Sequence, residues 1–277
     1  TQSPSSAASD VYKRQAYDDI IQAASGMASY QEAYSDQPSY TSGATADKAT
    51  GLMLALSVVS SLFKRNKDNK DLEVEVPMFE TMVDFTLVEH LYGYNFLPPK
   101  DEPVYPRQSS PNRKPYETKD GFIAVLPYND EQWLRFLKFI KKEHLIKTKK
   151  FSTLENRNKN VDELYSLLVK ELKKEKTNFW IKKLREIDIP SMKINKPKDL
   201  FIDEHLKKTN FFKTYKHSTE GDLMYPRLPV YFNNERDNES KFEAPNLGNK
   251  TKEILIDLGY DKNEIENLRK EKVIFFE

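Results

Sequence analysis

Asp47 is the residue whose type and position best support chemistry. It stands in the stretch ADKATG (residues 46–51), directly before a long apolar run. Aspartate is a favoured helix N-cap, where it stabilises the helix by about 1 kcal/mol through bonds to free backbone N–H groups. The same place keeps a carboxylate ionised through the helix dipole, and a carboxylate can act as a covalent nucleophile. Gly51 favours a functional role, because Gly within a helix costs about 1 kcal/mol relative to Ala and usually serves close packing or approach.

Other kinds of catalytic site find little support in the composition. Cysteine is absent, which excludes disulfides, Fe–S clusters and cysteine nucleophiles. The four histidines are scattered, without an HExxH motif or a pair at i, i+4, and there is no glycine-rich phosphate loop. Lys and Arg number 44 against 43 Asp and Glu, so no net field draws the chain to nucleic acid or an acidic membrane.

The elements that must position Asp47 can be predicted from periodicity. Residues 48–65 are apolar on nearly every face and end in two cations, which predicts a buried helix. A polar turn at 66–71 precedes an alternating strand at 72–77, and residues 78–93 form another helix. This succession of helix, strand and helix indicates an α/β domain.

The remaining chain is predicted to alternate helices and short strands. Six prolines between 95 and 118 favour an extended linker. A turn follows at Asp120-Gly121, and Gly259 stands where a helix should stop. The elements expected are strands at 122–128, 189–194 and 223–232, and helices from Asp130, twice within 160–186, at 197–212, at 251–258 and at 261–272.

Residues 1–15 are small, polar and aperiodic, and we expect them to be a non-native or disordered leader. The sequence shows no uninterrupted apolar run approaching the ~18 residues of a membrane span, and no signal-peptide pattern at its start. These features predict a cytoplasmic protein.

Seven blocks of the sequence resemble, in register, the CaiB/BaiF proteins, the family III coenzyme A transferases that also include formyl-CoA transferase and alpha-methylacyl-CoA racemase. The resemblance runs from residue 16 to residue 277. The blocks are residues 16–27, 46–65, 74–93, 105–133, 188–212, 217–232 and 244–260.

The resemblance implies an α/β fold of the CaiB/BaiF type, with a partial Rossmann-like large domain and a small α+β domain. In the intact family two chains interlock as a homodimer. The expected division is 16–92 for the remaining large domain, 93–112 for a linker, 113–200 for the small domain and 201–277 for a segment returning to the large domain.

The resemblance also implies a reaction. Asp47 would be the nucleophile of a CoA-transferase that moves CoA from an acyl-CoA donor to a small carboxylic acid, through aspartyl anhydride and aspartyl-CoA thioester intermediates. Coenzyme A would be a substrate, with no permanently bound cofactor or metal. Ala16, Tyr17 and Asp18 match positions near the CoA pantetheine and the thioester. An equally ordinary interpretation makes Tyr17 an aromatic anchor and Asp18 a helix cap.

Two alternatives remain beside the transferase. The family's racemases place a His on the segment matched by residues 16–18, where this sequence has Tyr17, and a phenol of pKa about 10 is a poorer base near neutral pH. A non-catalytic scaffold with lysine-rich helices is the other alternative. The family's amino-terminal portion has no counterpart here, so we expect this chain alone to be inactive or nearly so.

Arg113 is a hypothetical acceptor-side residue. It closes the stretch Ser109–Arg113, and arginine suits the recognition of carboxylates. An ordinary surface or linker arginine is the competing interpretation. The turn at 66–71 departs from the family's glycine-containing turn, so its geometry is expected to differ.

Overall fold

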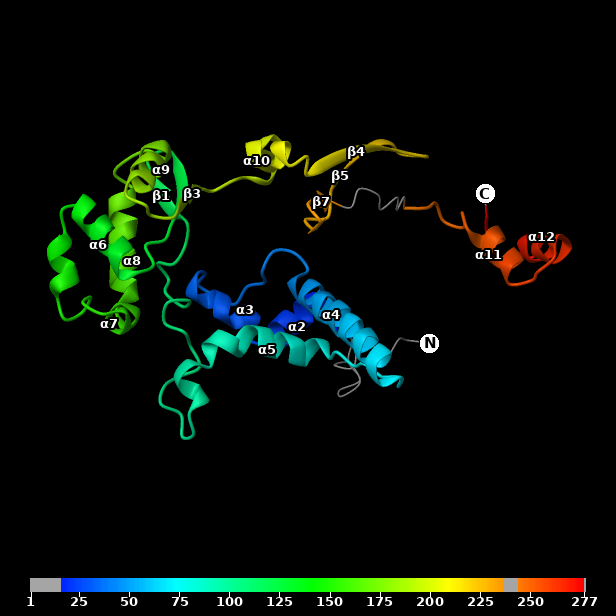
Figure 1. Ribbon diagram of the computed structural model, residues 1–277, viewed down its shortest axis with the longest axis horizontal. Coiled ribbons are helices and arrows are strands. Elements are labelled where there is room, and N and C mark those ends of the chain that lie inside the picture. The colour runs from blue at the N-terminus through cyan, green and yellow to red at the C-terminus, as the bar shows by residue number, and fades with distance from the viewer. Residues whose placement is uncertain (1–15, 237–243, 277) are drawn as a thin grey trace. The chain divides into compact units, whose positions relative to one another are not determined.

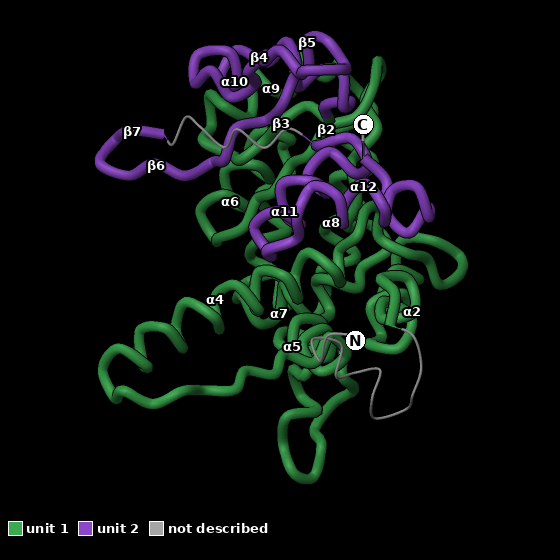
Figure 2. Tube along the Cα trace, turned by 90° about the vertical axis from the view of Figure 1, so that its right-hand side faces the viewer, with its two compact units in different colours: residues 1–194 green, residues 195–277 purple. Residues whose placement is uncertain are grey.

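The computed structural model describes residues 16–236 and 244–276. The expected leader, residues 1–15, lies outside the described residues. The chain divides into two compact units, Thr1–Ile194 and Asn195–Glu277, each of which is described by itself (Figure 1, Figure 2).

Helices form the first part of unit 1. They are α2 (Asp18–Ala24), α3 (Met27–Tyr30), η2 (Gln31–Ala33), α4 (Thr45–Asp68), α5 (Met78–His90) and η3 (Tyr92–Asn95). Helices α2, α4 and α5 contact one another in all three pairs (Figure 1). Their common core consists of Ile21, Ala46, Met78 and Met82. This small core fixes the first turn of α4 against α2.

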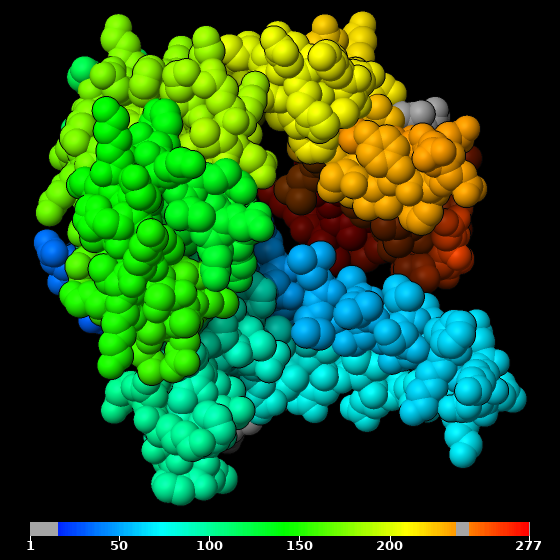
Figure 3. All heavy atoms as spheres, turned by 60° about the vertical axis from the view of Figure 1, so that its left-hand side comes forward, coloured from blue at the N-terminus to red at the C-terminus, as the bar shows by residue number. Residues whose placement is uncertain are grey.

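Helix α4 differs from its prediction in burial. Of its residues only Ala46 is buried, whereas Leu52 is 75% exposed and Phe63 is 76% exposed. In the space-filling view the blue-to-cyan side chains of this helix lie at the surface (Figure 3). The sequence of α4 is apolar enough for a buried helix, but α2 and α5 cover only part of the helix surface.

By length and composition alone, α4 could also cross a membrane, and only 11% of its most apolar 18-residue stretch is buried. This differs from the expectation that no segment would be long and apolar enough to span a membrane. That expectation required an uninterrupted apolar run, whereas a helix with a few polar residues can still be apolar enough on average. A single such helix is weak support for a membrane location, because core helices of other proteins meet the same criterion.

Two predictions around the end of α4 are wrong. The helix continues to Asp68, through half of the expected turn, and ends at Asn69 in the left-handed conformation with φ 50°. Residues 72–77 form no strand. Alternation of side chains is not sufficient for a strand, whose backbone groups need a neighbouring strand to pair with.

The second part of unit 1 is a small α+β region. Its three strands β1 (Tyr116–Thr118), β2 (Gly121–Val125) and β3 (Ser191–Lys193) form an antiparallel sheet in that order. The predicted turn at residues 120–121 is confirmed, because Thr118 pairs with Gly121. The helices are α6 (Asp130–Phe139), η4 (Glu143–Lys147), α7 (Leu154–Lys159), α8 (Val161–Leu172) and α9 (Thr177–Glu186). The predicted helix from Asp130 and the two within 160–186 are therefore confirmed.

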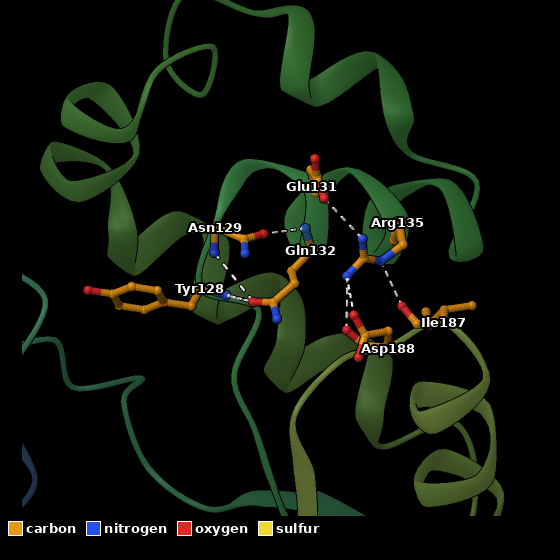
Figure 4. Close-up of polar contacts among 7 residues, drawn as sticks. All are labelled: Tyr128, Asn129, Glu131, Gln132, Arg135, Ile187 and Asp188. Atoms are coloured by element: carbon orange, nitrogen blue, oxygen red, sulfur yellow. Dashed lines mark hydrogen bonds and ion pairs between the residues drawn. The ribbon is translucent and has the colours of Figure 1, made fainter.

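Helix α6 illustrates how local sequence fixes this region. Asn129 accepts a hydrogen bond from the Gln132 backbone N–H at 2.8 Å, and the Gln132 side chain accepts from the Asn129 N–H in return (Figure 4). Arg135 then joins α6 to the end of α9: its Nε donates to the Ile187 carbonyl at 2.8 Å, and its Nη2 lies 3.1 Å from Asp188 Oδ2. These contacts hold α6 beside α9, and the apolar face of α6 packs into a continuous core with α8, α9 and the sheet.

Unit 2 contains short elements. The strands are β4 (Phe212–His217), β5 (Gly221–Pro226), β6 (Tyr231–Phe232) and β7 (Glu235–Arg236), paired as two hairpins. The helices are η5 (Pro197–Ile202), α10 (Glu204–Lys208), α11 (Thr251–Asp257) and α12 (Lys262–Lys270). The predicted helix at 197–212 is interrupted at Asp203, which caps α10 by accepting from the Leu206 N–H at 3.0 Å. The strand predicted at 223–232 is two separate strands.

Candidate active site

The candidate nucleophile lies in the first turn of α4. The helix begins at Thr45 with Ala44 as N-cap, so Asp47 is the third helical residue and not the cap that the sequence suggested. Its side chain is exposed, and its carboxylate has no hydrogen bond or ion pair with any described residue. An acidic group in this turn interacts favourably with the helix dipole. The carboxylate of Asp47 is therefore free to meet a substrate.

Asp18 supplies the cap from another helix. Its Oδ2 accepts hydrogen bonds from the backbone N–H groups of Ala46 at 2.7 Å and Asp47 at 3.1 Å. Asp18 itself lies in the first turn of α2, so its carboxylate faces the amino ends of two helices. The expectation that Asp18 acts as a helix cap is met on α4, 28 residues away in sequence.

A buried glutamine connects this cap to the loop before α4. Gln22 is fully buried, and its Nε2 donates to Asp18 Oδ1 at 2.5 Å. Its Oε1 accepts from the Thr41 backbone N–H at 2.9 Å and from the Thr41 hydroxyl at 3.1 Å. Thr41 in turn shares a 2.8 Å hydroxyl contact with Thr45, the first residue of α4. The position of Asp47 thus depends on side chains of α2 and the intervening loop.

This capping leaves no free N–H in the first turn of α4. The Thr45 N–H donates to the Gly43 carbonyl at 2.8 Å, and the Lys48 N–H donates to the Ala44 carbonyl at 3.1 Å. The N–H groups of Ala46 and Asp47 bind Asp18. Backbone donors at this helix start, which could have stabilised an oxyanion, are already occupied in this structure.

The other residues matched to the CoA site have different surroundings. Ala16 packs against the core around Ile21 and Ala46. Tyr17 is the N-cap residue of α2 and is 63% exposed, so it does not anchor into the described core. Gly51 has no described atom within 4 Å of the position that a Cβ would take. The described residues therefore give no packing reason for Gly51, and the alternative reason, close approach of another group, stays a prediction.

Arg113 directly follows the expected linker (93–112), and its Nη1 donates to the Tyr34 hydroxyl at 2.9 Å. The Tyr34 hydroxyl also contacts the Gln108 carbonyl. These bonds join the linker to the segment after α3, and none of the described contacts joins Arg113 to Asp47. The acceptor-side role of Arg113 stays a prediction.

His90, at the end of α5, is a residue that the sequence did not single out. It is buried, its ring stacks on Tyr30 with centroids 3.8 Å apart, and its Nδ1 accepts from the Tyr105 N–H at 3.2 Å. Burial lowers the pKa of His90, an effect that the nearby Glu89 carboxylate partly offsets. A lone histidine on an amphipathic helix carries no signal that separates it from a surface residue.

Within residues 16–236 and 244–276, no group of three or more His, Cys, Asp or Glu side chains is arranged to hold a metal ion. The carboxylates near the start of α4 are the pair Asp18 and Asp47, of which the first is engaged by backbone donors. The arrangement favours nucleophilic chemistry by a single free carboxylate.

Comparison with known proteins places this geometry in context. The family model described as CoA-transferase family III matches residues 7–251. The chain is 29% identical over 246 residues to a (R)-2-hydroxy-4-methylpentanoate CoA-transferase of Clostridioides difficile, covering 86% of this chain and 59% of that protein. It is 26% identical over 262 residues to a succinyl-CoA:glutarate CoA-transferase of Homo sapiens, covering 93% and 59%. The chain thus spans less than two thirds of the length of these relatives.

Solved structures show the same fold. A CaiB/BaiF family protein from Brucella suis superposes with a TM-score of 0.64 at 23% identity, covering 88% of this chain and 63% of that one. Rv3272 from Mycobacterium tuberculosis superposes with a TM-score of 0.63 at 19% identity, covering 80% and 59%. The mixed α/β fold of the CaiB/BaiF type expected from the sequence is confirmed.

Proposed function

Because this chain belongs to CoA-transferase family III, we propose that its protein moves CoA from an acyl-CoA donor to a small carboxylic acid, with Asp47 as the nucleophile. The observation that supports the proposal is the free carboxylate of Asp47 in a helix turn whose own N–H group and that of Ala46 are bound by Asp18. The relatives named above act as CoA-transferases, and the racemase alternative is not favoured.

In the proposed reaction the carboxyl carbon of Asp47 is first part of an anhydride, then bonded to the CoA sulfur as a thioester, and then part of a second anhydride. An Asp47 oxygen attacks the thioester carbonyl of the donor, the C–S bond breaks, and a mixed anhydride and CoA thiolate result. The thiolate attacks the aspartyl carbonyl and expels the donor's carboxylate, which leaves an aspartyl-CoA thioester. An acceptor carboxylate then displaces the thiolate to form a second anhydride. The returning thiolate attacks the acceptor's acyl carbon, and Asp47 is regenerated as a carboxylate.

Asp18 serves this reaction by keeping the first turn of α4 in place. Its negative charge also lies close to the helix start, where it would repel the CoA thiolate and the donor carboxylate and so favour their departure from Asp47. In our proposal Ala16 and Tyr17, which precede Asp18 in the chain, face the pantetheine arm of CoA. The exposure of Tyr17 leaves its ring available for that contact.

The substrate class is proposed from the activities of the relatives, whose substrates include a branched 2-hydroxy acid and the dicarboxylate glutarate. We propose small hydroxy- or dicarboxylic acids as acceptors, an interlocked homodimer and a cytoplasmic location. The exposed apolar side chains of α4 support a partner surface. The divisions 16–92, 93–112, 113–200 and 201–277 are proposed as the functional domains.

The test is trapping of the activated aspartyl group. The chain and the full-length product of its gene are incubated with hydroxylamine and a panel of acyl-CoAs that includes succinyl-CoA and 2-hydroxy-4-methylpentanoyl-CoA. Hydroxylamine converts an aspartyl anhydride or thioester into a hydroxamate, which mass spectrometry detects on the peptide containing Asp47. We expect the mass shift to disappear in Asp47→Asn.

The matched control is Asp19→Asn, which removes an exposed carboxylate one residue from Asp18 and should leave the trapping intact. A protein that folds and binds CoA, yet gives no hydroxamate with any donor, would contradict the transferase proposal. A hydroxamate on a different residue would contradict the assignment of Asp47 as the nucleophile but not the transferase proposal itself.

A further inference from the structure

A cavity of about 100 Å³ lies in the small α+β region of unit 1, apart from the candidate nucleophile. Arginine and aromatic side chains dominate its wall, and no acidic residue is among those that line it. The lining residues used below are Arg107, Tyr128, Trp133, Arg157 and Tyr165. They come from the linker, from the segment before α6, from α6 itself and from α7 and α8.

The cavity wall contains two guanidinium groups, and only one of them forms an ion pair with a carboxylate of the described residues. Arg157 is 2% exposed; it donates through Nη1 to the Phe151 carbonyl at 2.9 Å and pairs through Nη2 with Asp130, whose side chain is 68% exposed. Arg107 has its guanidinium carbon 5.0 Å from the centroid of the Tyr128 ring. It has no hydrogen bond or ion pair with any residue that the structure describes. One positive charge at this wall is therefore not neutralised.

Tyr165 presents a further donor. Its side chain is 2% exposed, and its hydroxyl has no hydrogen-bond partner among the described residues. Burial raises the pKa of Tyr165, and the charges of Arg107 and Arg113 oppose this rise. The phenol consequently keeps its proton near neutral pH and can donate a hydrogen bond.

We propose that this cavity binds a small oxyanion, with Arg107 and Tyr165 as the principal donors. Arg107 is partly buried, and its buried Nε has no hydrogen-bond partner among the described residues, so binding of an anion would offset the cost of withdrawing this charge from water. Guanidinium groups suit carboxylate and phosphate oxygens. The rings of Tyr128 and Trp133 reduce the solvent around the charges, which strengthens the attraction. Carboxylates and inorganic phosphate share this chemistry. Asp47 and residues 16–18 do not line the cavity, so the inference stands apart from the proposed transferase activity.

The test is calorimetric titration of the whole chain with acetate, succinate and inorganic phosphate, each at constant ionic strength. We expect saturable binding of at least one anion. Arg107→Gln should weaken it by about tenfold or more, because a charge-assisted hydrogen bond is lost. Tyr165→Phe removes only the hydroxyl and should weaken binding by about three- to tenfold. Binding of succinate or acetate alone would assign the site to carboxylates, and binding of phosphate alone would assign it to phosphoryl groups.

The matched controls are Arg185→Gln and Tyr260→Phe, which change the same residue types outside the cavity and should bind as the parent does. Circular dichroism of each variant establishes that it folds, and Tyr165→Phe decides the question if Arg107→Gln does not fold. Absence of saturable binding for all three anions overturns the proposal. So does binding that survives both cavity variants, or that the two controls weaken equally.

Discussion

At the start of α4 two aspartates have separate roles. Asp18 accepts the backbone hydrogen bonds of the first turn, and the Asp47 carboxylate is left without a described partner. A nucleophile that also capped its own helix would have to break those bonds before attacking a thioester. In the proposed reaction, capping from α2 removes that requirement, because the helix start would stay satisfied while Asp47 attacked the thioester.

We expect Asp18→Ala to lower the free energy of unfolding by about 1–2 kcal/mol, since two backbone donors lose their acceptor. Asp18→Asn, which keeps an acceptor oxygen, should cost less. Urea denaturation followed by circular dichroism measures both changes. Asp19→Ala provides the comparison and should stay within about 0.5 kcal/mol of the parent. Equal effects at the two positions would show that the bonds to α4 add no stability.

His90 predicts a pH dependence. Its pKa is lowered in the folded chain by burial, so the unfolded chain takes up the proton first as the pH falls. The free energy of unfolding should therefore decrease as the pH falls through about 6.5, the ordinary histidine value. Protonation of Nδ1 would also remove the acceptor for the Tyr105 N–H.

Urea midpoints at pH 7.5 and pH 6.0 would measure this effect for the parent and for His90→Gln. The variant should lose part of the pH dependence, whereas His144→Gln, at an exposed histidine, should retain it. An unchanged difference between the two pH values in His90→Gln would assign the dependence to other groups.

At the scale of elements, two glycines of unit 1 should respond oppositely to the same change. A Cβ at Gly93 in η3 would overlap the Cβ of Asp101 and lie 2.9 Å from the Asp101 backbone nitrogen, so we expect Gly93→Ala to cost about 1–3 kcal/mol. A Cβ at Gly51 within α4 meets no described atom. Gly51→Ala should accordingly stabilise the chain by about 0.5–1 kcal/mol.

Thermal unfolding of the two variants provides the measurement, with the sign of the change as the readout. If Gly51→Ala destabilises the chain, the space beside that residue is filled by atoms outside the described residues. Activity of the full-length Gly51→Ala protein would then show whether the space serves the substrate.

The sequence predicted most of the elements whose signals are local. The helix start at Asp130, the turn at residues 120–121 and the stop at Gly259 each depend on a few adjacent residues, and the structure has them. Elements that depend on distant partners were predicted less well. Residues 72–77 alternate correctly but have no neighbouring strand, and the interruption at Asp203 depends on a cap that the helical pattern obscures.

The candidate site shows the same division. The ADKATG stretch located Asp47, but no periodicity could reveal that Asp18 would cap the helix of Asp47 or that Gln22 would lie buried beneath it. The contacts of Asp18 with the start of α4 join residues 28 and 29 apart, those of Gln22 with Thr41 join residues 19 apart, and both arise from the packing of α2 against α4 and the loop before it.

For the molecule as a whole, the exposed face of α4 has the largest consequence. Leu52, Leu56, Val59 and Phe63 recur at helical spacing and are all more than half exposed. A contiguous apolar surface of this kind marks an interaction site or an aggregation liability. Because the chain spans 59% of the length of its relatives, we expect the purified chain to associate through this face.

Light scattering after size-exclusion chromatography would measure that association. Replacing Leu56 and Phe63 together by Glu should lower the apparent mass toward that of one chain, because charges on this face oppose its burial. Leu247→Glu, at an isolated exposed leucine in unit 2, should leave the mass unchanged. Association that persists in the double variant would place the contact on another surface.

The core of the small α+β region also gives the molecule an internal spectroscopic reporter. Trp133 and Trp180 are the two tryptophans of the chain, and both are buried in this one core. The Trp180 indole N–H donates to the Leu172 carbonyl at 2.8 Å, which fixes the ring. Tryptophan emission therefore records the melting of this region alone, whereas far-ultraviolet circular dichroism sums the helices of both units. A single shared transition would mean that the units unfold together, and two midpoints would mean that each has its own stability.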